Sequence, residues 1–175
     1  MKTLRHLLAI LLLPGVVTVV VPLWIARSTG GTLHVGWGLP APASLLPSIL
    51  GCLLVGVGLL LMYRTIALFA GFGEGTLAPW DPPTRLVVRG VYRRVRNPMI
   101  SGVFFVLLGE ATLLGSPPIF VWFLVVFALN AVYIPLIEEP DLSQRFGEEY
   151  LTYKRNVPRW VPRLRPWTQE PGPRP

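Results

Sequence analysis

Residues 99–139 read MISGVFFVLLGEATLLGSPPIFVWFLVVFALNAVYIPLIEE, and this stretch decides the fold. It contains two strongly apolar runs, 99–114 and 119–137, which only the Gly-Ser-Pro-Pro of residues 115–118 separates. A helix of about 20 apolar residues can cross the hydrocarbon core of a bilayer. Glycine commonly ends a helix and proline commonly begins one. We therefore expect a tight hairpin of two membrane-spanning helices.

Two further apolar runs lie upstream, at residues 7–26 and 45–62. Lys2 and Arg5 precede the first run, as they would in a signal peptide, but the run is longer than a signal peptide's apolar core and no clear cleavage site follows it. We therefore expect it to remain as a first span. The sequence predicts an all-α fold, a polytopic membrane helix bundle of about four transmembrane helices.

The lysines and arginines indicate how this bundle is oriented. Fifteen of the sixteen fall in three places: the N-terminus, the segment 64–96, and the tail from Glu138 onward. Four spans put these three places on one side of the membrane, and lysine and arginine are enriched in cytoplasmic loops. We therefore predict that both termini are cytoplasmic.

The composition excludes several other classes of protein. Of the 175 residues, 52% are hydrophobic and only 14% are charged, whereas about 25% are charged in an average soluble domain. The net charge is +7, but the cations flank apolar runs, so we expect a membrane and not a nucleic acid as the partner. The single cysteine, Cys52, allows no disulfide within the chain, and His6 and His34 lie on opposite sides of the predicted membrane, so we predict no metal site.

The segment after the fourth run has the pattern of an amphipathic helix. Asp141 and Gln144 have the spacing of a capping box. Apolar and aromatic side chains then recur at helical spacing, up to a stop at Val157-Pro158; they are Leu142, Phe146, Tyr150 and Tyr153. We expect a C-terminal cytoplasmic helix that completes a single domain over residues 1–167. The proline-rich residues 168–175 are predicted to be disordered.

The predicted hairpin brings charged residues of opposite sign together. It places Arg93, Arg94 and Arg96 at the same depth as Glu138 and Glu139. These charges could simply pair and close the bundle, or they could form a polar cup for a ligand that carries both cationic and anionic groups. Within the spans, we expect Glu110 and Asn130 to face each other or the bundle interior, where hydrogen bonds would hold helices together.

Two segments, LVVRGVYRRVRNPMISG at 86–102 and EEPDLSQRFGEEYLTYKRNVPRWVP at 138–162, carry a family resemblance. They are similar to the isoprenylcysteine carboxyl methyltransferase and phospholipid methyltransferase superfamily of integral membrane enzymes that use S-adenosylmethionine. The resemblance covers about residues 84–162. Gly90, Tyr92, Arg96 and Pro98 match the cofactor motif of that family, while Asn97 replaces a histidine and Ile100 a tyrosine.

The resemblance implies a site made from both segments. Alignment through Phe146 and Gly147 places the family's cofactor-binding glutamate at Glu138. Ile134 stands where the prenylcysteine enzymes carry an arginine for the substrate carboxylate, and Arg96 is the cation that could replace it. The cofactor-binding residues that the resemblance implies are Thr84, Arg85, Leu86, Val87, Tyr92, Asn97, Pro98, Met99, Ile100 and Glu138, and the substrate-binding residues are Ile134 and Arg96.

The expected function is transfer of a methyl group from S-adenosylmethionine to a lipophilic or membrane-embedded acceptor at the cytoplasmic face. An in-line displacement needs alignment and exclusion of water more than it needs acid–base groups, so no catalytic residue is assigned. Ile134 favours an acceptor without a carboxylate, such as a lipid amine, a thiol or a phenol-like hydroxyl. The alternatives are carboxyl O-methylation of protein isoprenylcysteine and a non-catalytic membrane scaffold or transporter subunit.

Overall fold

The computed structural model describes residues 11–29, 34–72 and 86–168, and within these ranges the chain forms helices and turns without strands. This agrees with the predicted all-α class. The elements are the π-helix η1 (Leu11–Val20), α2 (Val21–Ser28), the short η2 (Val35–Gly38), α3 (Leu45–Phe72), the short η3 (Gly90–Arg93), α4 (Pro98–Leu114), α5 (Pro117–Tyr133), the π-helix η4 (Ile134–Glu138) and α6 (Glu139–Asn156).

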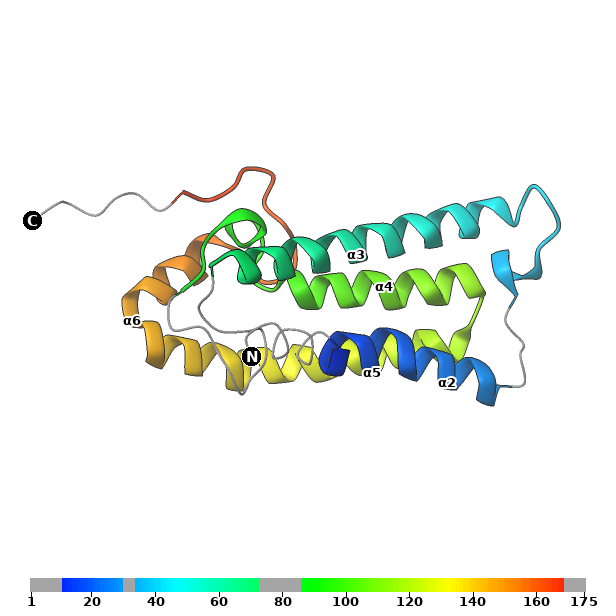
Figure 1. Ribbon diagram of the computed structural model, residues 1–175, viewed down its shortest axis with the longest axis horizontal. Helices are drawn as coiled ribbons and strands as arrows, with labels where there is room; N and C mark the ends of the chain where they lie inside the picture. The colour runs from blue at the N-terminus through cyan, green and yellow to red at the C-terminus, as the bar shows by residue number, and fades with distance from the viewer. Residues whose placement is uncertain (1–10, 30–33, 73–85, 169–175) are drawn as a thin grey trace, which may run out of the picture.

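The long helices lie side by side and give the molecule an elongated shape (Figure 1). The predicted hairpin is present, with α4 and α5 joined through Gly115 and Ser116. Gly115 adopts the left-handed conformation (φ 57°) that favours glycine at the end of a helix, and Pro117 opens α5. At this same end of the molecule, His34 N–H donates to the carbonyl of Leu114 and Trp37 Nε1 donates to the carbonyl of Thr112.

Helices α3 and α4 pack closely because glycines meet at their interface. A Cβ atom on Gly58 would lie 2.6 Å from the carbonyl oxygen of Gly102, and one on Gly102 would lie 2.9 Å from that of Gly58. The same contact recurs between Gly51 and Gly109, where a Cβ on Gly109 would lie 2.8 Å from the oxygen of Gly51. Small residues that let two backbones approach are typical of helix interfaces inside membranes.

The outer surfaces of the helices are apolar. The stretches Leu45–Leu68 and Pro117–Asn156 contain windows long and apolar enough to cross a membrane, and only 17% of each window is buried within the protein. A core helix of a water-soluble protein would be mostly buried, whereas Leu46, Leu129 and Leu136 are exposed here. Together these features indicate a membrane protein. Pro14–Ser28 and Pro98–Leu114 are shorter apolar helices, so the four-span count stays a prediction.

The predicted start of the C-terminal helix is wrong. Helices α5, η4 and α6 run on continuously, and Glu138 and Glu139 have helical backbone angles, so Asp141 does not cap a helix. It lies in the first turn of α6 and instead pairs with Arg145 at 3.4 Å. The capping box was predicted from the spacing of Asp141 and Gln144, and this spacing does not show whether a helix already precedes them. The helix is already formed when it reaches Asp141, because η4 joins α5 to α6 and the N–H of Glu139 donates to the carbonyl of Ile134, five residues earlier.

The predicted apolar face of α6 is confirmed. Tyr150, Tyr153 and Val157 form a buried cluster. Helix α6, which carries Tyr150 and Tyr153, lies at one end of the molecule (Figure 1). The side chains packed against this cluster are Leu86, Val88, Leu142, Phe146 and Trp167. Gly147 bends α6, with φ 54° and ψ −134°, a combination that suits glycine.

The predicted contact between Glu110 and Asn130 is not formed. Asn130 Nδ2 donates to the carbonyl of Val126 on its own helix at 2.8 Å. Glu110 Oε2 is buried and has no hydrogen-bond partner in the described structure. The side-chain amide of an asparagine can donate to the backbone carbonyl one turn earlier in its own helix. Asn130 therefore does not need a partner on another helix.

Candidate functional site

Glu139 is the centre of a buried ion-pair cluster at the α6 end of the bundle. Its side chain is only 2% exposed, and three cations contact it. Oε1 accepts from Arg96 Nη1 and from Arg159 Nε, both at 2.7 Å, and Oε2 lies 2.8 Å from Lys154 Nζ. We call these four residues the Glu139 cluster. It connects the residues just before α4 to α6 and to the segment after α6.

The cations control the ionisation of Glu139. Burial by itself raises the pKa of a carboxyl group, but the hydrogen bonds from Arg159 and Lys154 and the charge of Arg96 outweigh burial and lower the pKa of Glu139 to about 2. Glu139 is therefore ionised at neutral pH. Its two oxygens are occupied by partners within the chain, so Glu139 has a structural role in closing the bundle.

Glu138, its neighbour, is placed differently. It makes no ion pair or hydrogen bond within the described residues, although it is partly buried at the end of η4. Burial raises the pKa of Glu138, and the negative charge of Glu139 raises it further, while Arg159 and Arg96 act in the opposite direction. A buried carboxylate without a partner is costly unless a cation approaches it. Among the described residues, Glu139 is thus the paired acid and Glu138 the acid without an ion-pair partner.

Tyr92 borders Glu138 from η3. Burial raises the pKa of Tyr92, and the nearby Tyr153 and Glu138 raise it further, so its hydroxyl stays protonated. Tyr153 fixes this segment because its hydroxyl donates to the carbonyl of Tyr92 at 2.7 Å. The pKa of Tyr150 is also raised by burial, to about 12. The hydroxyls around the two glutamates are therefore hydrogen-bond donors at neutral pH.

Arg96 has donor capacity left inside the protein. Its side chain is 10% exposed, and Nη1 contacts Glu139 and, at 3.5 Å, the hydroxyl of Tyr150. Its Nε is buried and has no hydrogen-bond partner in the described structure. This N–H is therefore available to a group outside the described residues.

The other two arginines do not reach the acid pair, so the prediction that all three would meet it is wrong. Arg93 donates through Nε to the carbonyl of Trp167 and through Nη2 to the hydroxyl of Thr168. Arg94 donates to the carbonyl of Leu164. Both hold the segment after α6 against the chain before α4, and Trp160 of that segment stacks on Phe104 at 5.3 Å between ring centroids.

Lys154 and Arg159 are the members of the Glu139 cluster that the sequence reasoning missed. They follow Glu139 by 15 and 20 residues, and no local spacing indicates that they return to it. The bend at Gly147 lies between Glu139 and both residues, and the end of α6 at Val157 also lies between Glu139 and Arg159. The signal that could have indicated them was their positive charge, in the segment that follows the two adjacent glutamates.

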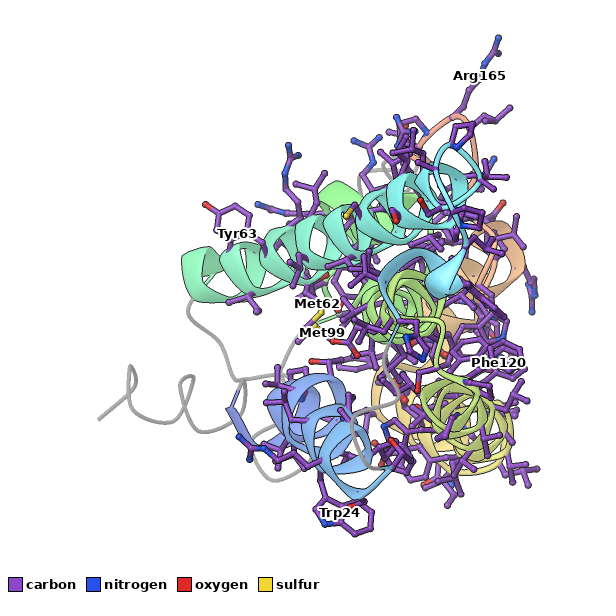
Figure 2. All side chains as sticks on the ribbon, turned by 90° about the vertical axis from the view of Figure 1, so that its right-hand side faces the viewer. Trp24, Met62, Tyr63, Met99, Phe120 and Arg165 are labelled. Carbon is purple, nitrogen blue, oxygen red and sulfur yellow. The ribbon has the colours of Figure 1, made fainter. Side chains whose placement is uncertain are left out.

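The residues predicted to bind the cofactor lie in different parts of the structure. Thr84 and Arg85 fall outside the described residues. Leu86 packs on the Tyr150–Tyr153–Val157 cluster and Val87 is partly buried, whereas Met99 packs with Met62 in a separate hydrophobic core (Figure 2). The expected apolar wall of Leu86, Val87 and Met99 therefore spans two clusters.

The remaining predicted residues surround the start of α4 and the π-helix. Asn97 precedes α4, and its carbonyl accepts from the backbone N–H and the hydroxyl of Ser101. Pro98 is buried in the first turn and Ile100 is partly buried. Ile134 is 1% exposed at the start of η4. Three of the predicted residues are close enough to interact electrostatically. Glu138 raises the pKa of Tyr92, and Arg96 acts to lower the pKa of Glu138.

Comparison with known proteins identifies the family. A protein-S-isoprenylcysteine O-methyltransferase B of Arabidopsis thaliana is 38% identical over 79 residues, which are 45% of this chain and 40% of the relative. A protein-S-isoprenylcysteine O-methyltransferase of Xenopus laevis is 35% identical over 88 residues, 49% of this chain and 30% of the relative. The aligned parts thus span less than half the length of these relatives. No solved structure matches the chain. Residues 46–149, more than half of the chain, match the family described as phospholipid methyltransferase, and the chain therefore belongs to that family.

Proposed function

We propose that this protein transfers a methyl group from S-adenosylmethionine to a lipophilic acceptor held in the membrane. The observation that carries the proposal is the different state of the two adjacent glutamates. Glu139 is paired with three cations, while Glu138 is partly buried and has no ion-pair or hydrogen-bond partner in the described structure. A cationic ligand at Glu138 would relieve the cost of that buried carboxylate.

The residues present fit the chemical groups of S-adenosylmethionine. This molecule carries an ammonium, a sulfonium and a carboxylate. Glu138 offers a carboxylate for a cationic group, and the unpaired Nε of Arg96 offers a charged donor for an anionic one. The protonated hydroxyl of Tyr92 lies close enough to Glu138 to feel its charge. A site with one free anion and one free cationic donor matches a ligand of mixed charge.

When bound, S-adenosylmethionine supplies an electrophilic methyl group on its sulfur. The chain's residues then have three tasks. Glu138, Arg96 and Tyr92 orient the ligand, the apolar cluster of α6 around Tyr150 and Tyr153 keeps water from this end of the bundle, and the outer faces of the helices admit an acceptor from the bilayer. Alignment of the reacting atoms and exclusion of water contribute most of the rate enhancement in such a displacement.

Carboxyl O-methylation of a protein isoprenylcysteine is the second candidate. The names of the two relatives favour it. Ile134 argues against it, because this buried apolar residue gives no countercharge for a substrate carboxylate. Arg96 is already paired through Nη1 with Glu139, so its charge is partly neutralised before a substrate carboxylate arrives. An acceptor that is neutral before methylation therefore suits this site better.

The proposed site faces the cytoplasm in a four-span topology. Figure 1 supports this arrangement, because the end of α3, the start of α4 and all of α6 lie at one end of the molecule. That end carries most of the described arginines, and cytoplasmic ends of spans are rich in arginine and lysine.

Binding of labelled S-adenosylmethionine to the purified protein in detergent tests the proposal. We expect saturable binding, followed by methyl incorporation into an acceptor when membrane lipids or prenylcysteine substrates are added. Incorporation into lipids alone would favour the first candidate, and incorporation into prenylcysteine alone would favour the second. Absence of saturable binding by folded protein would refute both and would favour a non-catalytic scaffold or transporter subunit.

A further inference from the structure

A cavity of about 280 Å³ lies between the end of α3 and η3, apart from the Glu139 cluster. Arg64 and Leu68 line it from α3, and Gly90, Val91 and Arg94 line it from the η3 segment. Neither Glu138, Glu139 nor any other acidic residue of the described chain lines it. The cavity thus combines two guanidinium groups with apolar side chains.

The two arginines are not neutralised within the described structure. Arg94 donates once, through Nη1 to the carbonyl of Leu164 at 3.0 Å, and this leaves other N–H groups of its guanidinium available. Arg64 is exposed and makes no hydrogen bond or ion pair with the described residues. Two cations that line one cavity repel each other, so an anion between them would be stabilised by both. Planar guanidinium groups are well suited to phosphate oxygens.

An apolar stripe on α3 leads to this cavity. Leu60, Val57 and Leu53 precede Arg64 by four, seven and eleven residues, so they lie on the same face of the helix. Their side chains are 53%, 45% and 62% exposed. This stripe continues toward the other end of α3 with the exposed Leu50 and Leu46. A ligand whose phosphate lies at Arg64 could therefore place a long hydrocarbon chain along α3.

We propose that this cavity binds the phosphate group of an anionic phospholipid, with an acyl chain lying along the Leu53–Val57–Leu60 stripe. The two arginines would bind the phosphate of the headgroup, and the apolar stripe would contact the acyl chain. A soluble phosphate compound would use only the cations, so the stripe favours a lipid. The site is separate from the proposed methyl-transfer site and does not depend on methyl transfer.

Native mass spectrometry of the full chain in detergent tests this proposal. The titrants are phosphatidylglycerol, zwitterionic phosphatidylcholine, glycerol phosphate and inorganic phosphate. We expect phosphatidylglycerol to bind at least tenfold more tightly than the other three. Arg64→Gln and Arg94→Gln should each weaken its binding about tenfold, the size of one lost hydrogen bond between charged groups.

Arg155→Gln is the matched control, because Arg155 is an exposed arginine of α6 that does not line the cavity. We expect it to leave phosphatidylglycerol binding within about twofold of the original chain, on the scale of an exposed charge. An equal loss of phosphatidylglycerol affinity in all three variants would show that net charge alone attracts the lipid, and this would overturn the proposed site. Unchanged binding in Arg64→Gln would also overturn it, and glycerol phosphate binding as tightly as the lipid would overturn the lipid assignment. Because Arg94 also contacts Leu164, Arg64→Gln decides the matter if Arg94→Gln lowers the unfolding temperature.

Discussion

Arg96 Nη1 and Glu139 Oε1 lie 2.7 Å apart and link the segment before α4 to the first residue of α6. Arg159 and Lys154 complete the pairing, so the carboxylate is saturated by partners within the chain. This saturation leaves Glu138 without a cation among the described residues. We therefore expect different roles for these two adjacent glutamates, stability for Glu139 and ligand binding for Glu138.

Glu139→Gln should destabilise the protein strongly. The change removes the buried anion and leaves Arg96, Arg159 and Lys154 without their common partner. Breaking a buried ion pair in this way costs about 3–5 kcal/mol. Thermal unfolding in detergent should show a clearly lowered midpoint, while Glu149→Gln, an exposed glutamate on the same helix, should leave it nearly unchanged. Equal midpoints for the two variants would contradict the structural role of Glu139.

Acid should remove the contribution of Glu139 to stability. Its pKa is lowered to about 2 in the folded protein, against about 4.3 in an unfolded chain. A group with a lowered folded pKa stabilises the fold fully above the unfolded pKa, and this stabilisation disappears as the pH falls toward the folded pKa. Stability measured by denaturant unfolding should therefore fall between about pH 4.3 and pH 2. The Glu139→Gln variant should show a weaker decline over that range, and identical profiles would count against the assignment.

Glu138→Gln should weaken S-adenosylmethionine binding by about tenfold or more, because a charged hydrogen-bond partner is lost. Calorimetry measures this directly, and Glu148→Gln serves as the exposed control on the same helix. Burial raises the pKa of Glu138, so acidification should protonate it and weaken binding at a pH above the ordinary glutamate range. The variant should lack this pH dependence. Affinity equal to that of the original protein would remove Glu138 from the site.

Gly58→Ala should destabilise the α3–α4 interface. The new Cβ would lie 2.6 Å from the carbonyl oxygen of Gly102, too close without a shift of the backbone. Overpacking of this kind costs about 1–3 kcal/mol. Gly56→Ala is a matched control in the same helix, because a Cβ atom at that position would meet no neighbouring atom within 4 Å. We expect thermal unfolding to separate the two variants, and a similar midpoint for both would mean that the helices are not packed through Gly58.

Cysteine labelling should place the two ends of the bundle on opposite sides of the membrane. Cys52 is exposed and unpaired, so Cys52→Ala should retain the fold and provide a background without cysteine. In that background, an impermeant thiol reagent should label Leu39→Cys on intact cells and Arg155→Cys only after permeabilisation. Labelling of both residues from one side would rule out the four-span topology and the cytoplasmic site.

Local sequence signals determined the helices and the hairpin. Long apolar runs, the Gly-Ser-Pro-Pro turn at residues 115–118 and the apolar spacing that ends at Val157 each depend on neighbours in the chain, so they could be interpreted without coordinates. The family resemblance drew attention to Glu138 and Arg96 in the same way. The start of α6 was mispredicted because the helix continues from α5 through η4, so the Asp141–Gln144 pattern lies inside a helix and does not begin one.

The partners of the charges were decided only by the tertiary structure. Whether Glu138 or Glu139 is the paired acid depends on which face of η4 and α6 meets Arg96, and on the bend at Gly147 between Glu139 and Lys154. Likewise, Arg93 and Arg94 contact the segment after α6 and not the glutamates. Charge pairs act over a few ångströms between residues far apart in sequence, so their choice follows from how the helices pack and not from the order of residues.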